Sequence, residues 1–535
     1  LRPRRSIPPP MPTDTSPQTS AALPFPNAHD GRPRALLIGT AATLGLLSDQ
    51  IALLPNGPVP VGYVLADADR PMLGFDTLDT LPRVCTTARP DIAIVSLPAE
   101  RTTTALRVRS LLASLSLPER VVPPLDELVR RSPQTSGSRG SLNWADLIGR
   151  TPHGIDRHQV ASMLEGRRVL ITGAGGSIGS EIARIVAGFR PELIVLMERA
   201  ENALFEIDRQ IRERFPTVRR KAILHDVADT EGTMRHLAAD RPHVVFHAAA
   251  HKHVPLMEDH PSHAVNNNFF GTRSIADASL AVGAERFVLI SSDKAVNPTS
   301  VMGATKRLAE MYVQGLHRQS RAISPASTRF CMVRFGNVLG SACSVLPIWA
   351  SQIDAGGPVT VTDERMTRYF MTIQEAAMLV IQAAALQGDS PAAPVYVLDM
   401  GEPIRILDLA CRFISAQGLS PSFAGQRAGP GDIEIRFTGA RPGEKLYEEL
   451  AYDREQLTPT PHPGIGAWTH TSAGEVNLPL MVAELAAVRT SHDKEAVLSA
   501  IRRHVPEMRP SGLPTDIKPL DATLTKTDPT PAIAA

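Results

Sequence analysis

The chain has 535 residues, which predicts more than one domain, because domains average about 150 residues. Its 56 Lys+Arg and 55 Asp+Glu give a formal net charge of +1. This balance excludes the global basic excess that is typical of nucleic-acid binding proteins. The four cysteines are widely separated and show neither a metal-binding nor a disulfide spacing, which favours a reduced, cytoplasmic protein.

The two ends of the chain are rich in proline and predict disorder at 1–34 and 506–535. The longest apolar stretch, 35–47, is shorter than the about 20 residues that a membrane-spanning helix needs. No signal peptide follows the first arginines. The sequence starts at Leu1 and not at Met, so we expect either a fragment or a true start elsewhere, such as Met11.

Strands alternate with helices in the first ordered part of the chain. Strands are predicted at 35–39, 59–67 and 91–98, and the segment 120–131 closes the unit. This alternation predicts a small parallel α/β domain over 35–131, followed by a polar linker over 132–160. Its first turn keeps only Gly39 and Gly45 of a nucleotide-binding glycine pattern, so we interpret the domain as structural or assembly-related.

A second α/β series begins with a strand, a glycine turn and a helix over 167–186. Glycines at this point let the backbone approach a pyrophosphate, which the helix N-terminus favours. Glu198, near the end of the next strand at 193–199, can accept hydrogen bonds from the adenosine ribose, which favours NAD over NADP. The residues of this turn that we expect to bind the cofactor are Gly173, Gly176, Ser177, Ile178 and Gly179.

Three further strands are predicted at 222–227, 243–250 and 286–295. Asp226 and Val227 are expected at the adenine, and the small Ala248 and Ala249 leave room for the cofactor. Ligands in doubly wound sheets bind beyond the carboxyl ends of the strands. The polar run at 291–294 lies at such an end.

The residues after the last of these strands carry the predicted catalytic chemistry. Met302 and Lys306 are four positions apart on one helix face, where short-chain dehydrogenases place Tyr and Lys. A thioether cannot act as an acid or a base, so proton transfer must come from elsewhere. Asp293 and Lys294 are the adjacent candidates, and Ser292 precedes them.

These motifs resemble the CapD-type polysaccharide-biosynthesis proteins, long nucleotide-sugar 4,6-dehydratases of the extended short-chain dehydrogenase family. The methionine at 302 is itself typical of this long subgroup. The resemblance covers roughly 150–455. The stretches that carry it are TGAGGSIGSE (172–181), HAAAHKHVPLME (247–258), NNFFGT (267–272), SSDKAVNPTSVMGATKR (291–307), VRFGNVLGS (333–341), MTRYFMT (366–372) and RPGEKLYEEL (441–450).

The resemblance implies an α/β fold with a small Rossmann-like domain, then an extended dehydrogenase domain over 161–470 with a smaller C-terminal substrate-binding part, and helices over 471–505. It also implies NAD as cofactor, a UDP-sugar substrate, most often UDP-N-acetylglucosamine, and a homo-oligomer. Hydride would leave C4, water would be lost across C5–C6, and the hydride would return to C6.

The same resemblance assigns roles to single residues. Lys294 would be the C5 base, with a pKa lowered by Lys306 and a dry site. Asp293 would protonate the departing C6 hydroxyl, Ser292 would meet the 4-hydroxyl, and Lys306 would hold the nicotinamide ribose. The nucleotide-sugar side would be lined by Lys252, Asn268, Arg334, Asn337, Arg368, Arg441 and Glu444.

Two departures and two alternatives stay open. Long members of the family normally begin with several transmembrane helices, and this sequence shows none, so we expect membrane association, at the inner face of a bacterial inner membrane, only of a longer form. Ala342 and Cys343 replace an Arg and a Gly of the family pattern, which could change affinity or assembly. A UDP-sugar C4 epimerase is disfavoured by Met302, and a non-catalytic NAD(H)-binding sensor by the intact 292–294 run. A metal site on His247, His251 and His253 is rejected, because no further ligand completes it.

Overall fold

The computed structural model describes residues 32–52, 58–67, 75–97, 102–115, 117–122, 147–386, 393–417, 419–423, 432–452, 457–468 and 476–509. The chain divides into two compact units, Leu1–Ser141 and Leu142–Ala535, and each is described by itself. The disorder predicted at both ends falls almost wholly outside the described residues. So do 123–131 of the first domain and 132–146 of the predicted linker.

The first unit contains a five-stranded parallel sheet in the order β3-β2-β1-β4-β5. The predicted strands at 35–39, 59–67 and 91–98 correspond to β1, β2 and β4. Apolar side chains are buried on both faces of this sheet, which is why its central strand reads as one apolar run. The elements are β1 (Arg34–Gly39), α1 (Ala41–Ala52), β2 (Val59–Leu65), β3 (Asp76–Thr77), α2 (Leu81–Ala88), β4 (Ile92–Ser96), α3 (Thr102–Ser114) and β5 (Glu119–Val121).

The second unit is built on a nine-stranded sheet in the order β20-β21-β16-β11-β10-β9-β6-β7-β8. The strands from β8 to β16 pair in parallel, whereas β21 and β20 pair antiparallel. The strands are β6 (Arg168–Thr172), β7 (Leu193–Glu198), β8 (Arg220–Leu224), β9 (Val244–His247), β10 (Arg286–Ile290), β11 (Arg329–Arg334), β16 (Val395–Leu398), β20 (Leu457–Pro459) and β21 (Ile465–Trp468).

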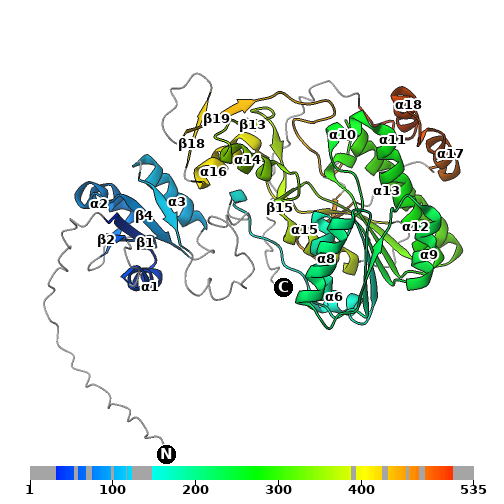
Figure 1. The fold of residues 1–535 in the computed structure, drawn as a ribbon, viewed down its shortest axis with the longest axis horizontal. Coiled ribbons are helices and arrows are strands. Elements are labelled where there is room, and N and C mark those ends of the chain that lie inside the picture. The colour runs from blue at the N-terminus through cyan, green and yellow to red at the C-terminus, as the bar shows by residue number, and fades with distance from the viewer. Residues whose placement is uncertain are drawn as a thin grey trace, which may run out of the picture. The chain divides into compact units, whose positions relative to one another are not determined.

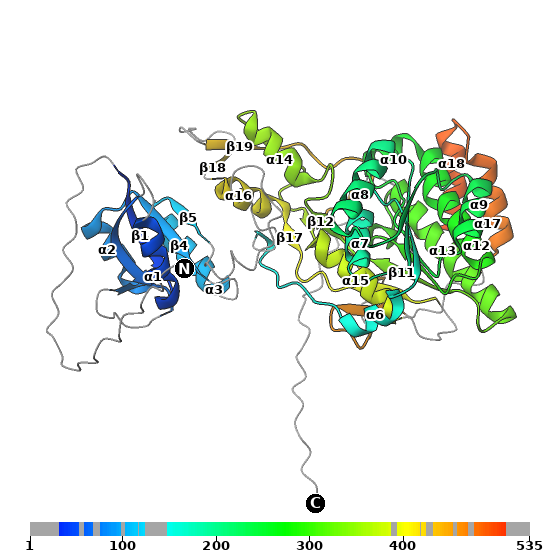
Figure 2. The same cartoon turned by 60° about the horizontal axis from the view of Figure 1, so that its bottom comes forward.

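Helices cover both faces of this sheet (Figures 1 and 2). One face is buried by α6 (Arg157–Leu164), α7 (Ser177–Ala187), α8 (Glu201–Arg214) and α15 (Ile373–Leu386). The other face is buried by α9 (Thr230–Asp240), α12 (Gly271–Ala281) and α13 (Val301–Ile323). The alternation of strand and helix with parallel pairing confirms the predicted doubly wound α/β fold.

Two smaller groups of elements flank the sheet. A third apolar cluster joins α13 to α10 (Val254–Asp259), α11 (Pro261–Ala264), α17 (Leu478–Val488) and α18 (Lys494–His504). The last two lie within 471–505, where the sequence predicts helices. The other group has its own apolar core and contains β12 (Asn337–Leu339), α14 (Val345–Asp354), β13 (Val359–Val361), β14 (Thr367–Arg368), β15 (Phe370–Thr372), β17 (Ile404–Arg405), α16 (Ile406–Ala416), β18 (Ser420–Phe423) and β19 (Asp432–Phe437).

The strand order of the large sheet reverses between β6 and β9. In doubly wound sheets the crevice outside the carboxyl ends of the strands at such a point is where ligands bind. The turns after β6, β9 and β10 therefore position the candidate site. Within the described parts of the chain, no helix combines the length and the apolar character that crossing a membrane requires.

Candidate functional site

The turn between β6 and α7 is built from glycines for steric reasons. Gly173 has φ +63°, and a Cβ there would lie 2.7 Å from the backbone nitrogen of Ala249. A Cβ on Gly179 would lie 2.1 Å from the carbonyl oxygen of Gly173. Glycine thus lets the turn pack against the chain that leaves β9 at Ala248, and lets α7 begin directly behind it. The N-terminus of α7, at Ser177 and the next turn of the helix, is suited to an anionic group.

Glu198 ends β7 and lies against this glycine turn. Its carboxylate accepts hydrogen bonds from the backbone nitrogens of Gly175 at 3.2 Å, Arg199 at 2.9 Å and Ala200 at 3.1 Å. The side chain is thereby fixed beside the turn that precedes α7. A carboxylate in this position can receive hydroxyl groups of a bound ribose.

The third strand is shorter than the sequence predicts. It ends at Leu224, so Asp226 and Val227 lie in the following turn and not in the strand. Asp226 is exposed and its carboxylate accepts a hydrogen bond from the Ala228 nitrogen at 2.9 Å, which stabilises the turn. Val227 is buried and packs against Gly271 at the start of α12.

Lys306 lies under the carboxyl end of β10. Its ammonium group donates to the carbonyl oxygen of Ile290 at 2.5 Å, and burial lowers its pKa to about 8. His247, at the end of β9, is held between the hydroxyls of Thr172 and Thr272 at 2.7 and 3.0 Å. Burial lowers the pKa of His247 to about 3, so this ring is neutral at physiological pH.

Met302 lies one helical turn before Lys306 and is 4% exposed. Its side chain belongs to the apolar cluster that joins α13 to α10 and α17, with Val254 and Phe269 as other members. Its surroundings are therefore apolar, and the thioether itself cannot move a proton.

Asp293 and Lys294 form the turn that follows β10. Asp293 is fully buried, and one carboxylate oxygen accepts from Ser292 Oγ at 2.9 Å and from Lys294 Nζ at 3.0 Å. Lys294 Nζ also lies 3.3 Å from Asn337 Oδ1 and 3.3 Å from Glu448 Oε1. The four polar side chains of Ser292, Asp293, Lys294 and Asn337 are thus brought together beyond the carboxyl end of β10.

The charge of Lys294 differs from the expectation. Burial acts to lower its pKa, but the carboxylates of Asp293 and Glu448 outweigh burial, and the net shift is upward. The sequence predicts a lowered pKa at Lys294, whereas its two carboxylate neighbours favour a raised one. The expected lowering rests on Lys306 and on dry surroundings. Glu448, the second carboxylate at Lys294, is not part of that expectation.

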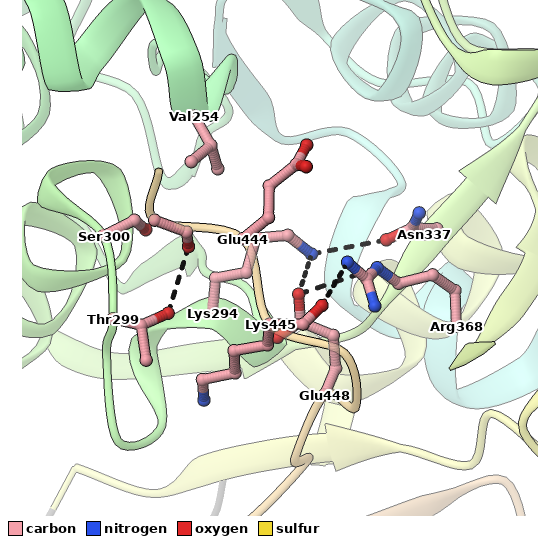
Figure 3. Close-up of a pocket in the computed structure, with 10 residues that line it drawn as sticks. Val254, Lys294, Thr299, Ser300, Asn337, Arg368, Glu444, Lys445 and Glu448 are labelled. Atoms are coloured by element: carbon pink, nitrogen blue, oxygen red, sulfur yellow. Dashed lines mark hydrogen bonds and ion pairs between the residues drawn. The ribbon is translucent and has the colours of Figure 1, made fainter. Parts of the chain in front are cut away.

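A cavity of about 140 Å³ opens beside Lys294 (Figure 3). Of the predicted substrate residues, Asn337, Arg368 and Glu444 line it together with Lys294. The lining residues that sequence reasoning missed are Val254, Thr299, Ser300, Gly443, Lys445 and Glu448. The signal for all six was present in the stretches that carry the resemblance, because 247–258 contains the first, 291–307 the next two and 441–450 the last three.

Arg334, which the sequence assigns to the substrate, does not line this cavity. It is fully buried, and its guanidinium donates to both carboxylate oxygens of Glu310 at 2.7 and 2.5 Å. The same group lies over the rings of Trp468 and Tyr452, at 4.9 and 5.5 Å from their centroids. Arg334 thus forms a structural ion pair between β11 and α13.

Asn268, which the sequence also assigns to the substrate, is fully buried away from this cavity. Its side-chain amide donates to the carbonyl oxygen of His251 and to Thr305 Oγ1, both at 3.1 Å, and its oxygen accepts from the His251 nitrogen at 2.7 Å. It therefore clamps the loop after β9 to α13. Arg441 is largely exposed and donates to Glu444 at 2.6 Å, which places it outside the cavity lining.

The loop with the unusual Ala342 and Cys343 reaches the glycine turn. The Ala342 nitrogen donates to Ser177 Oγ at 3.1 Å, and its carbonyl oxygen accepts from Lys252 Nζ at 2.6 Å. Lys252 therefore contacts this loop and not the cavity. Cys343 is exposed and has φ +55°, a value at which the family's glycine would be unstrained.

The histidines of the rejected metal hypothesis have other partners. His247 is bound by two threonines, and the His251 backbone is bound by Asn268. Throughout the described ranges, no group of three His, Cys, Asp or Glu side chains is arranged to hold a metal ion.

Several known proteins are similar to this chain. The probable polysaccharide biosynthesis protein EpsC of Bacillus subtilis is 40% identical over 447 residues, which are 81% of this chain and 71% of that protein. The capsular polysaccharide biosynthesis protein CapD of Staphylococcus aureus is 45% identical over 311 residues, 58% of this chain but only about half (49%) of that protein. A UDP-glucose 4-epimerase of Rickettsia massiliae is 31% identical over 304 residues, 55% of this chain and 80% of that protein.

The solved structure of Pen from Bacillus thuringiensis is 31% identical, with a TM-score of 0.51 over 58% of this chain and 90% of that one. Residues 169–469 match the family described as "Polysaccharide biosynthesis protein". This segment contains the glycine turn, the Asp293–Lys294 turn and the cavity. The resemblance to CapD-type proteins is thereby confirmed, and the chain belongs to this polysaccharide biosynthesis protein family.

Proposed function

We propose that the chain catalyses the NAD-dependent 4,6-dehydration of a UDP-N-acetylhexosamine, with UDP-N-acetylglucosamine as the first candidate. The product would be a 4-keto-6-deoxy sugar for a surface polysaccharide. The observation that carries the proposal is the Asp293–Lys294 turn, where an acid and a base meet at a cavity beyond the carboxyl end of β10. We place this activity in residues 161–470 and give the first unit a structural or assembly role.

The residues present fit a dinucleotide. Gly173 and Gly179 keep the space at the N-terminus of α7 open, because a Cβ at either position would collide with backbone. Glu198 is fixed beside this turn, and the Lys306 ammonium under β10 is suited to a ribose hydroxyl. The NAD bound there would supply the hydride acceptor at sugar C4 and the hydride donor at C6.

The chain's own groups would handle the protons. Lys294, once it has lost its own proton, would take the C5 proton, which a 4-keto group acidifies, and would return it to C5 as the hydride adds to C6. Oxidation at C4 also releases the proton of the 4-hydroxyl; the Asp293 carboxylate, beside Ser292, would take this proton and pass it to the departing C6 hydroxyl, which leaves as water. Asp293 Oδ2 is buried and has no hydrogen-bond partner among the described residues, so it is free to serve a ligand. Asn337 and Arg368, which line the cavity, would hold sugar hydroxyls or the diphosphate.

The rival activity is C4 epimerisation, which the name of the Rickettsia relative suggests. An epimerase of this fold needs an acid–base group at position 302. The apolar surroundings of Met302 support dehydration instead, because the Asp293–Lys294 pair is suited to eliminating water.

Proton NMR of the purified chain with UDP-N-acetylglucosamine and NAD⁺ tests the proposal. We expect a new C6 methyl doublet. Ring-proton changes without a methyl signal would establish epimerisation instead. Binding of NAD⁺ without turnover of several UDP-sugars would establish the sensor alternative.

A further inference from the structure

Glu448 is the second carboxylate at Lys294, and the activity proposed above does not yet use it. Its side chain is 3% exposed, and its Oε1 lies 3.3 Å from Lys294 Nζ and 3.7 Å from Arg368 Nε (Figure 3). Its other oxygen is buried without a hydrogen-bond partner in the described part of the chain. We propose that Glu448 is a positioning residue, which holds the Lys294 side chain at the cavity and, together with Asp293, fixes its charge.

Side chains before and after Glu448 bind the turn that follows β10. Tyr452 donates to the carbonyl oxygen of Ala295 at 3.2 Å, and Lys445 donates to that of Val296 at 2.7 Å. Glu449 accepts from the side chain of Asn297 at 3.1 Å. The Glu448–Lys294 contact is therefore one of four that join residues 445–452 to four successive residues of the turn.

Arg368 fixes this segment from the opposite side. Its guanidinium donates to the carbonyl oxygens of Lys445 at 2.8 Å and Leu446 at 3.1 Å. The backbone is thus bound just before Glu448, and the side chains of Glu449 and Tyr452 bind the turn just after it. A carboxylate held in this way has little freedom to leave Lys294, in contrast to a flexible surface ion pair.

The charges around the pair agree with this role. Lys294 faces Asp293 on its own turn and Glu448 and Arg368 from the other elements, and the two carboxylates raise its pKa despite burial. Burial would raise the pKa of Glu448, but Lys294, Arg368 and Lys445 keep it below its ordinary value. Both partners are thus charged in the unliganded protein. If the proposed function holds, Lys294 must lose its proton before it can take one from the sugar, so Glu448 controls when the base is active.

The protonation of Lys294 can be measured without turnover. The chain contains only eight lysines, so the full-length protein labelled with [ε-¹³C]lysine gives few signals to resolve. Lys294→Arg assigns the Lys294 signal by its loss. In Glu448→Gln we expect the titration midpoint of this signal to move to lower pH than in the wild type. Glu449→Gln, which removes the same charge from the next residue, should move it less.

An equal midpoint in the wild type and Glu448→Gln would overturn the inference, and so would equal shifts in the two Gln variants. If Glu448→Gln does not fold, Glu448→Asp replaces it. The aspartate side chain is one methylene shorter and loses the 3.3 Å contact to Lys294. The titration midpoint of the Lys294 signal must therefore also fall in this variant.

The two proposals fail separately, although this one rests on the proposed function for its meaning. A wild-type chain that makes no methyl product refutes dehydration but leaves the lysine titration intact. In a chain that does make the product, the rise of turnover with pH should move to lower pH in Glu448→Gln. A rise at the wild-type pH would show that Glu448 supports only the fold.

Discussion

Replacing Arg334 with methionine should destabilise the second unit by about 3 kcal/mol, the lower end of what breaking a buried ion pair costs. The variant leaves the fully buried Glu310 with only part of its present partners, Ser291 Oγ at 2.6 Å and Arg307 at 3.4 Å. Because these two contacts remain, we expect the destabilisation to lie at the lower end of that range. Methionine can still pack on the rings of Trp468 and Tyr452, so little apolar contact is lost.

The double variant Arg334→Met/Glu310→Met removes both charges and should recover stability to within about 1 kcal/mol of the wild type. Urea unfolding followed by tryptophan fluorescence measures both variants, since Trp468 lies beside the substituted group. In the wild type, burial would raise the pKa of Glu310, but Arg334 and Arg307 hold it below its ordinary value. The stabilisation by the Arg334–Glu310 pair is therefore present at neutral pH and is lost as pH falls. The difference in the free energy of unfolding between the wild type and Arg334→Met should consequently shrink in acid.

A substrate-binding Arg334 would behave differently. Arg334→Met would then keep the urea midpoint of the wild type and raise KM for the nucleotide sugar, and the double variant would bind no better. That result would refute the structural assignment.

Three further outcomes are expected. Gly173→Ala should weaken NAD⁺ binding about tenfold or more by calorimetry, because φ is +63° and the added Cβ would meet Ala249. Gly176→Ala is the milder control, and an equal loss of affinity in the two variants would contradict the steric argument. Asp293→Asn should slow formation of the methyl product about 100-fold or more while NAD⁺ still binds, and equal turnover would remove Asp293 from the chemistry. NAD⁺ affinity should fall as pH rises through about 8, where Lys306 loses its charge. The same pH dependence in Lys306→Met would show that Lys306 is not its cause.

The sequence predicted best what is encoded locally. The glycine turn, the acid at the end of β7 and the polar run after β10 each lie within one strand–turn–helix step, where spacing alone determines the geometry. The carboxyl ends of three strands were predicted too late, at 227, 250 and 295, whereas β8, β9 and β10 end at Leu224, His247 and Ile290. After β8, the Asp226 side chain stabilises a turn that begins before the predicted end of the strand.

Contacts between distant segments could not be predicted in the same way. Arg334 and Arg368 both lie at strand ends, yet one is buried against Glu310 and the other lines the cavity. Only the packing of α13 against β11 distinguishes them. The charge of Lys294 likewise depends on Glu448, which no local pattern connects to it.

The turn at residues 294–297 also has a consequence for how the protein is made. Its three supporting contacts, from Lys445, Glu449 and Tyr452, span 149, 152 and 157 residues of sequence. The ribosome makes the chain from its N-terminus, and domains generally fold as units. Residues 294–297 therefore stay without these three partners until residues 445–452 have been made, so the turn cannot be fixed before most of the family segment 169–469 has been synthesised.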